Sequence, residues 1–153
     1  NFFQLYSGTD DIDPREFFVE YNKRPEIDRW ILSRYNNLLK MYNENMDKFE
    51  VTKVVRAISD FVIEDLSNWY IRRNRRRFWN TEVDDDKKAV YNTTYEILLG
   101  FSKIIAPITP FVAEEMYRNL TDKKSVHLDF IPECDESLLM KHWKKKWISL
   151  EIL

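Results

Sequence analysis

The residues with the most distinctive chemistry in this chain lie in one stretch, residues 68–79, which reads NWYIRRNRRRFW. Five of the six residues at positions 72–77 are arginines, and aromatic residues stand on both sides of them. Guanidinium groups form paired hydrogen bonds to phosphate and stack on nucleobases. Aromatic rings such as those of Phe78 and Trp79 stack on unpaired bases. The stretch therefore predicts contact with single-stranded RNA.

The same arginines have a second interpretation that needs no RNA. They can pair with carboxylates of the protein itself, such as the acidic run at residues 84–86. They can also dock on an acidic partner or on a neighbouring domain. A helical scaffold or protein-interaction module is therefore the alternative to RNA binding.

Other residue types that support catalysis or metal binding are scattered along the chain. His127 and His142 are isolated, and Cys134 is the only cysteine, without a histidine at motif spacing. Glu114 and Glu115 are adjacent, which would set them about 100° apart on a helix rather than facing each other. The sequence therefore predicts no catalytic residue and no metal site in this chain.

Composition narrows the class of protein. The chain has 153 residues, of which 44% are hydrophobic and 33% charged, as expected for one soluble globular domain with a core. Only two residues are glycine, which argues against an all-β fold and against a glycine-rich phosphate loop. No apolar run reaches the roughly 18 residues of a membrane span, and the first residues given lack the basic-then-apolar pattern typical of a signal peptide. Because the chain does not begin with Met, we expect an excised piece of a longer protein.

Apolar residues recur at helical spacing, which predicts an all-α fold: an up-and-down bundle of four main helices plus a short one. The main helices are expected from Pro25 to about residue 43, from about residue 50 into the arginines, over residues 86–105, and after Asp135, with the short helix beginning at Pro110. The acidic run at residues 84–86, Thr109 and Asp135 are expected to supply the N-caps of the last three of these helices in chain order. Residues 1–24 are expected to be a lead-in arm that packs on the bundle, 25–120 the bundle core, and 121–153 an extended connector with a truncated C-terminal helix.

The register of the second helix makes a specific prediction about the arginines. Its apolar stripe ends at Trp69, and the positions three, four and seven residues further are Arg72, Arg73 and Arg76. The helix is therefore expected to run past the end of its bundle, so that its last turns protrude. Arg75 would lie about 100° from Arg76. Not all arginines can face RNA at once, and some are expected to brace neighbouring carboxylates.

The arginine-rich stretch, extended to Ser67, closely resembles the signature of the anticodon-binding domain of isoleucyl-tRNA synthetases. Residues 28–34 (DRWILSR) and 57–62 (AISDFV) resemble the first two bundle helices of that family. Residues 105–117 resemble the APxxPFxAEE segment that the isoleucine, valine and leucine enzymes share. Because that segment is specific only to the wider class, the arginines are what select isoleucine. A valyl-tRNA synthetase homologue is the alternative within the class.

The resemblance implies that the complete enzyme, an aminoacyl-tRNA synthetase of the cytoplasm, uses ATP and magnesium to attach isoleucine to its tRNA. The His-Ile-Gly-His-type and Lys-Met-Ser-Lys-Ser-type motifs that bind ATP are absent here. For this chain the resemblance implies a role without catalysis and without a cofactor, namely binding the anticodon stem-loop of isoleucine tRNA. Its other implied partners are the catalytic and editing domains of the same enzyme, and no membrane partner is expected.

By position, the resemblance assigns RNA contact to Arg72, Arg73, Arg75, Arg76, Arg77 and Trp79. Trp69 and Tyr70 are expected instead to support this end of the helix. Which of the arginines touch RNA, and which only brace the fold, stays open from the sequence.

Overall fold

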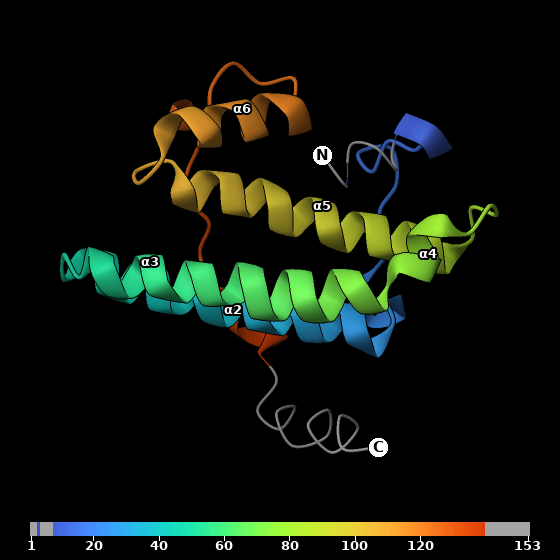
Figure 1. Ribbon diagram of the computed structural model, residues 1–153, viewed down its shortest axis with the longest axis horizontal. Coiled ribbons are helices and arrows are strands. Elements are labelled where there is room, and N and C mark those ends of the chain that lie inside the picture. The colour runs from blue at the N-terminus through green and yellow to red at the C-terminus, as the bar shows by residue number, and fades with distance from the viewer. Residues whose placement is uncertain (1–2, 4–7, 140–153) are drawn as a thin grey trace.

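The computed structural model describes residue 3 and residues 8–139. All regular elements of this part of the chain are helical, which confirms the predicted all-α class (Figure 1). Among the residues described, no helix is both long enough and apolar enough to cross a membrane.

Five α-helices lie wholly within the described residues and carry the fold, and a π-helical segment extends one of them. The α-helices are α2 (Glu26–Asp47), α3 (Val51–Asp60), α4 (Arg75–Trp79), α5 (Asp85–Ile105) and α6 (Pro110–Leu120). Helix α3 continues without a gap into the π-helical segment η2 (Phe61–Ile71), and three short 3-10 helices are η1 (Tyr21–Lys23), η3 (Val126–Leu128) and η4 (Glu136–Leu138). The predicted starts near residues 25, 50, 86 and 110 each lie within one residue of an observed start.

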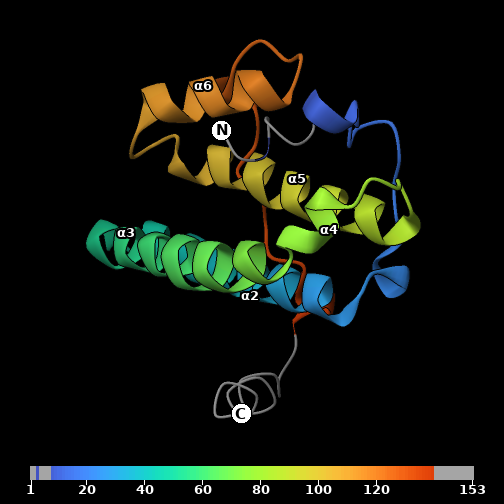
Figure 2. The ribbon, with the colours of Figure 1, turned by 45° about the vertical axis from the view of Figure 1, so that its right-hand side comes forward.

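The helices stack in three layers (Figures 1 and 2). Helix α2 and the α3–η2 helix lie side by side, α5 packs across them, and α6 covers α5 from the other side. The core between these layers is closed by apolar side chains with at most 2% of their surface exposed, among them Ile31, Leu39, Val54, Ile97 and Ile104. This burial supplies the main favourable term of folding.

Two helix starts show how local sequence sets the boundaries. The Asp84 carboxylate accepts a hydrogen bond from the backbone N–H of Lys87 at 2.8 Å, so the predicted N-cap of α5 is confirmed. Pro110 occupies the first turn of α6, as predicted, because its missing N–H would have no helical partner there. Thr109 holds the N-cap position without a capping hydrogen bond from its side chain.

The segments that flank the bundle are tied to it by side-chain amides. The amide of Asn92 in α5 accepts a hydrogen bond from the backbone N–H of Val19 at 2.8 Å and donates to the carbonyls of Pro14 and Phe17 at 3.0 Å. At the other end of the chain, Asn36 of α2 accepts a hydrogen bond from the backbone N–H of Asp135 at 2.8 Å.

Most of the predicted C-terminal helix falls on residues 140–153, which lie outside the described residues, as does His142. In the described part Asp135 does act as a cap, as predicted. Its carboxylate accepts a hydrogen bond from the backbone N–H of Ser137 at 3.1 Å, at the start of η4.

The predicted register of the arginine-bearing helix is wrong. The buried face does not pass from Trp69 to Arg72, Arg73 and Arg76. Instead it runs through Phe61, Leu66, Tyr70, Asn74 and Phe78, which are all no more than 5% exposed. Those residues recur at every fourth or fifth position. The cause is the π-helical segment, whose i to i+5 hydrogen bonds put more residues into each turn than the about 3.6 of an α-helix.

The predicted protruding helix end is also wrong. The chain breaks its helix at Asn74, and the short helix α4 then packs on the beginning of α5. Phe78 of α4 is fully buried and meets the ring of Tyr91 edge to face at 5.3 Å. The arginines are therefore presented on a folded corner of the bundle and not on a free helix end.

Candidate nucleic-acid interface

Arg77 is turned into the bundle. Its Nη1 donates to Asp28 Oδ1 at 2.6 Å and its Nη2 to Asp28 Oδ2 at 2.7 Å, and Asp28 is fully buried. The hydroxyl of the fully buried Tyr70 donates to the same Asp28 Oδ1 at 2.6 Å. We call these three residues the Asp28 clamp. It joins the first turn of α2 to the end of η2 and to α4.

Arg77 also ties α4 to the beginning of α5. Its Nε donates to Asp86 Oδ2 at 3.0 Å, and its Nη2 donates to the backbone carbonyl of Asp86 at 2.9 Å. This confirms the expectation that some of the arginines brace carboxylates, including one from the acidic run at residues 84–86. The guanidinium of Arg77 is thus held by carboxylates on two sides.

The environment of the clamp shifts the pKa values of Arg77 and Tyr70. Burial by itself would lower the pKa of Arg77, but the hydrogen bonds and the charge of Asp28 outweigh it and raise that pKa above its usual value. Burial, followed by the charge of Asp28, raises the pKa of the Tyr70 hydroxyl well above its usual value. Arg77 therefore stays charged and the Tyr70 hydroxyl stays neutral throughout the neutral pH range.

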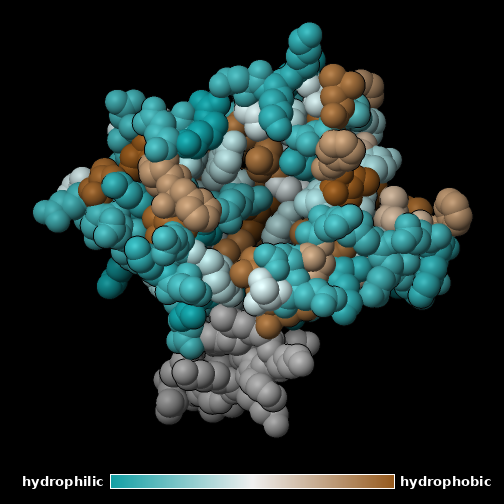
Figure 3. Space-filling view, turned by 180° about the vertical axis from the view of Figure 1, so that it is seen from behind, coloured by the Kyte–Doolittle hydropathy of each residue, from teal (hydrophilic) through white to brown (hydrophobic). Residues whose placement is uncertain are grey.

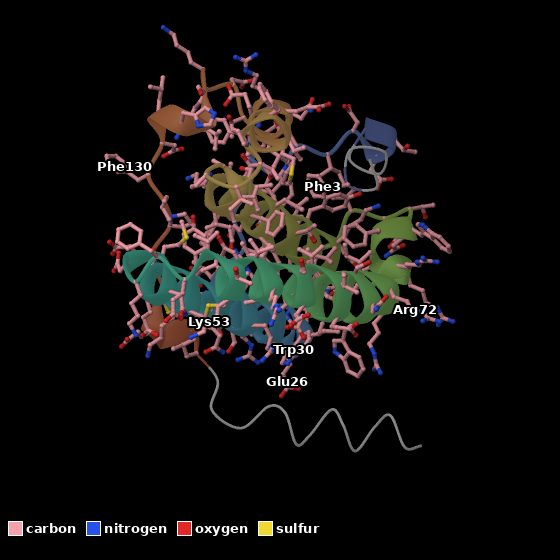
Figure 4. The ribbon with its side chains drawn as sticks, turned by 60° about the vertical axis from the view of Figure 1, so that its left-hand side comes forward. Phe3, Glu26, Trp30, Lys53, Arg72 and Phe130 are labelled. Carbon is pink, nitrogen blue, oxygen red and sulfur yellow. The ribbon has the colours of Figure 1, made fainter. Side chains whose placement is uncertain are left out.

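Three arginines face solvent next to the clamp. Arg72, Arg75 and Arg76 are exposed, and none of them makes a hydrogen bond or ion pair with another of the residues that the structure describes. Figure 4 shows Arg72 pointing outward from the corner of the bundle. Guanidinium groups in this state can bind an external anion without first breaking a contact inside the protein.

Arg73 is exposed as well, but it has an aromatic partner. Its guanidinium carbon lies 3.6 Å from the centroid of the Trp69 ring. Trp69 is half-buried and contacts the buried ring of Trp30 in α2, with centroids 6.1 Å apart. Trp69 thus connects the arginine-bearing corner to the core.

The two aromatic residues that close the stretch differ completely in environment. Trp79 is 57% exposed at the end of α4, where a ring can meet a ligand, whereas Phe78 is fully buried. The interpretation of Phe78 as a base-stacking ring is therefore wrong, because its faces are covered by the protein core. The buried Tyr70, expected to support the helix, lies in the clamp.

Sequence reasoning missed Asp28, although a signal for it was present. Asp28 lies three, four and seven residues before Ile31, Leu32 and Tyr35, which are all buried in α2. It therefore falls on the apolar face of the helix, where a carboxylate needs a buried partner. The pattern could have predicted such a partner, but not that it would be Arg77.

The four most exposed apolar side chains described lie outside the segments that carry the arginines. Phe49, Phe111, Leu128 and Phe130 are each at least 77% exposed, more than any other large hydrophobic residue described, and none of them lies in η2 or α4. Figure 3 shows apolar patches between hydrophilic side chains on the rear face, and Figure 4 shows Phe130 and Arg72 at opposite ends of the molecule. Among the exposed large hydrophobic residues described, η2 and α4 carry only Ile63 and Trp79.

Comparison with known proteins agrees with this geometry. Residues 28–151 match the family model described as the anticodon-binding domain of tRNA ligase. An isoleucine–tRNA ligase from Porphyromonas gingivalis is 49% identical over 137 residues, which cover 89% of this chain and 12% of that protein. Isoleucine–tRNA ligases from Clostridium novyi and Clostridium tetani are 44% and 42% identical, over 91% and 95% of this chain.

This chain spans 12% to 14% of the length of these relatives. The resemblance inferred from the arginine-rich stretch is confirmed by the family match, which covers most of the chain. The arginine corner, the helical bundle beneath it and the match across residues 28–151 lead to one conclusion: the chain belongs to the family of anticodon-binding domains of tRNA ligases.

Proposed function

We propose that this chain binds the anticodon stem-loop of isoleucine tRNA as part of an isoleucine–tRNA ligase. The observation that carries the proposal is the set of three exposed arginines, Arg72, Arg75 and Arg76, which lack ion-pair partners among the described residues and stand on a corner fixed by the Asp28 clamp. The names of the relatives supply the choice of isoleucine.

The three arginines suit the RNA backbone. A guanidinium group binds a phosphate through two parallel hydrogen bonds, and each phosphate neutralised releases condensed counterions. Such contacts set affinity and register, while base contacts carry sequence specificity. Trp79, which is 57% exposed, is the candidate for a base contact beside them. Arg77 has a different part in this proposal, because Asp28 and Asp86 hold its guanidinium.

We extend the proposal to the whole enzyme on the strength of the relatives' names. The complete protein would attach isoleucine to its tRNA in the cytoplasm, with ATP and magnesium bound by its catalytic domain. No residue of this chain is assigned to those ligands. The catalytic and editing domains of the same enzyme would be the other partners of this chain, and binding of the anticodon would orient the distant acceptor end toward the catalytic site.

Fluorescence titration of the full natural protein with isoleucine tRNA at several salt concentrations tests the proposal. Binding should weaken steeply with salt, and the Arg72→Gln, Arg75→Gln and Arg76→Gln variants should each bind more weakly. The salt slope is the steepness with which the logarithm of the binding constant falls against the logarithm of the salt concentration. Each substitution that removes one phosphate contact should reduce this slope by about 0.7 to 0.9. Arg56→Gln is the matched control: Arg56 is also exposed, has no partner among the described residues, and lies in α3 well before the arginine corner. Its removal should leave the slope unchanged.

The other outcomes are informative. Equal affinity for valine tRNA would remove the isoleucine assignment and leave RNA binding intact. No RNA binding at low salt would overturn the proposal. Capture of an acidic protein partner, lost in Arg72→Ala/Arg76→Ala, would then support the interaction module instead.

A further inference from the structure

We infer that Arg73 and Trp69 together form a shelf that receives one unpaired nucleobase of the bound RNA. This inference rests on the proposed function and deepens it. It assigns Arg73 to a base, whereas Arg72, Arg75 and Arg76 bind phosphates. We call the pair the Arg73 shelf.

The first observation is the geometry of the pair. Arg73 lies one helical turn beyond Trp69, and its guanidinium carbon is 3.6 Å from the ring centroid, well inside the about 6 Å that defines a cation–π contact. At this distance the flat guanidinium is in van der Waals contact with the ring. Arg73 is exposed, so solvent reaches the guanidinium side chain that lies over this ring. Flat, cationic faces of this kind stack on bases in single-stranded RNA.

The second observation is how firmly the shelf is held. The Trp69 ring contacts Trp30, which is 8% exposed, at 6.1 Å and an interplanar angle of 57°. The next residue in the chain, Tyr70, is fully buried in the Asp28 clamp. The Trp69 ring on which Arg73 lies is therefore held in place before RNA binds. A preorganised surface loses little conformational entropy on binding, so less of the stacking free energy is lost when an unpaired base binds to it.

The third observation is the neighbour of the shelf. Arg72 precedes Arg73 in the chain, is exposed and makes no ion pair with another described residue. A nucleotide carries a flat base and an anionic phosphate, and the shelf and Arg72 together match these two groups. An acidic protein segment would satisfy Arg72 but would not need the stacked face of Arg73. The combination therefore favours RNA over an acidic protein at this corner.

The test uses the full natural protein and the anticodon stem-loop of isoleucine tRNA, in a series in which each loop nucleotide in turn is made abasic. Arg73→Lys keeps the positive charge and removes the flat face. It should raise the Kd for the intact stem-loop by about 5- to 150-fold, the range found for loss of one stacked base, with an unchanged salt slope. At one loop position, removing the base should raise the Kd for the unsubstituted protein by the same factor. For Arg73→Lys, that abasic RNA and the intact stem-loop should have equal Kd values.

Arg72→Gln is the matched control for this coupling. It should lower the salt slope by about 0.7 to 0.9 and keep the full sensitivity to the abasic position. Because Arg73 is exposed, Arg73→Lys should fold normally, which circular dichroism can check.

Each failure has a distinct signature. No binding of the stem-loop by the unsubstituted protein would overturn the proposed function. If the unsubstituted protein binds normally and Arg73→Lys binds with the same affinity, the shelf alone is overturned. The same holds if Arg73→Lys loses affinity by an equal factor for every abasic RNA. If Trp79→Leu is the variant that becomes insensitive to one abasic position and Arg73→Lys is not, then the base stacks on Trp79 and the shelf is again overturned.

Discussion

Asp28 and Arg77 lie 49 positions apart in the chain and form a doubly hydrogen-bonded ion pair, with N–O distances of 2.6 and 2.7 Å. Asp28 belongs to α2 and Arg77 to α4, so the pair joins the first turn of the bundle to the arginine corner. The carboxylate is fully buried, and a buried carboxylate that loses its ion-pair partner destabilises the fold. The position of the solvent-facing arginines therefore depends on a contact made deep inside the protein.

Asp28→Ala should lower the free energy of unfolding by about 3 to 5 kcal/mol, the usual cost of breaking a buried pair by removing one partner. The substitution leaves the guanidinium of Arg77 and the hydroxyl of Tyr70 without their shared acceptor. Urea unfolding followed by circular dichroism measures the change. Glu44→Ala is the control, because Glu44 is an exposed acid of the same helix, and it should stay within about 0.5 kcal/mol. Equal effects of the two substitutions would contradict a stabilising clamp.

Gly100→Ala should destabilise the bundle by about 1 to 3 kcal/mol, as overpacking does in a filled core. A Cβ atom at this position of α5 would collide with the hydroxyl oxygen of Tyr35 in α2, so the Tyr35 side chain or one of the two helices must shift. Tyr35→Phe in the same chain removes that oxygen and should recover part of the loss, which thermal unfolding of the double variant would reveal. Gly8→Ala, where a Cβ atom meets nothing within 4 Å, should leave the unfolding temperature nearly unchanged. A purely additive double variant would argue against the close approach.

Phe78 and Trp79 are neighbours whose substitutions should have opposite consequences. Phe78→Ala empties a fully buried site and should lower the free energy of unfolding by about 3 to 5 kcal/mol. Trp79→Ala removes a ring that is 57% exposed and should cost less than about 1 kcal/mol of stability while weakening tRNA binding. Unfolding curves and tRNA titrations on both variants separate the two roles. A Trp79→Ala variant that is destabilised and binds normally would assign this ring to the fold.

The free energy of unfolding should fall in acid as Asp129 becomes protonated. The hydrogen bond from Tyr117 at 2.6 Å, followed by one from the backbone N–H of Phe130, lowers the pKa of Asp129 well below its usual value. A carboxyl group with a lowered pKa contributes stability that is fully present above the unfolded pKa of about 3.9 and is lost as the pH falls toward the folded pKa. Urea midpoints measured between pH 5 and pH 2 should therefore fall less steeply in Asp129→Asn, measured against Asp47→Asn as an exposed control. Parallel curves for the two variants would contradict this role.

The same contact predicts a change in alkali. Burial, followed by the hydrogen bond to Asp129, raises the pKa of Tyr117 to about 12. A raised pKa in the folded state contributes stability below the unfolded pKa of about 10, and this contribution is lost as the pH rises through about 12. Tyr117→Phe should therefore flatten the loss of stability between these two values. The ultraviolet absorbance of tyrosinate, titrated in the native protein and in Tyr117→Phe, checks the assignment.

The sequence by itself determined the features that depend on neighbouring residues. Asp84 and Pro110 could be recognised as helix starts because a cap and a first-turn proline act within a few residues along the chain. The all-α class followed from apolar spacing, and the family followed from the arginine-rich stretch together with the segment around Pro107 and Pro110. All of these signals are local, so they are readable before the chain folds.

Only the tertiary structure decided which of the arginines face the solvent and which one pairs inside the protein. Five arginines of the same type stand within six positions, and their order in the sequence does not distinguish them. Arg77 faces inward because Asp28, 49 residues earlier, is buried in front of it. The π-helical turns of η2 rotate the buried face onto Asn74 and Phe78, which leaves Arg72, Arg75 and Arg76 in solvent. A register set by packing between distant helices cannot be read from spacing alone, because spacing assumes a uniform helical pitch.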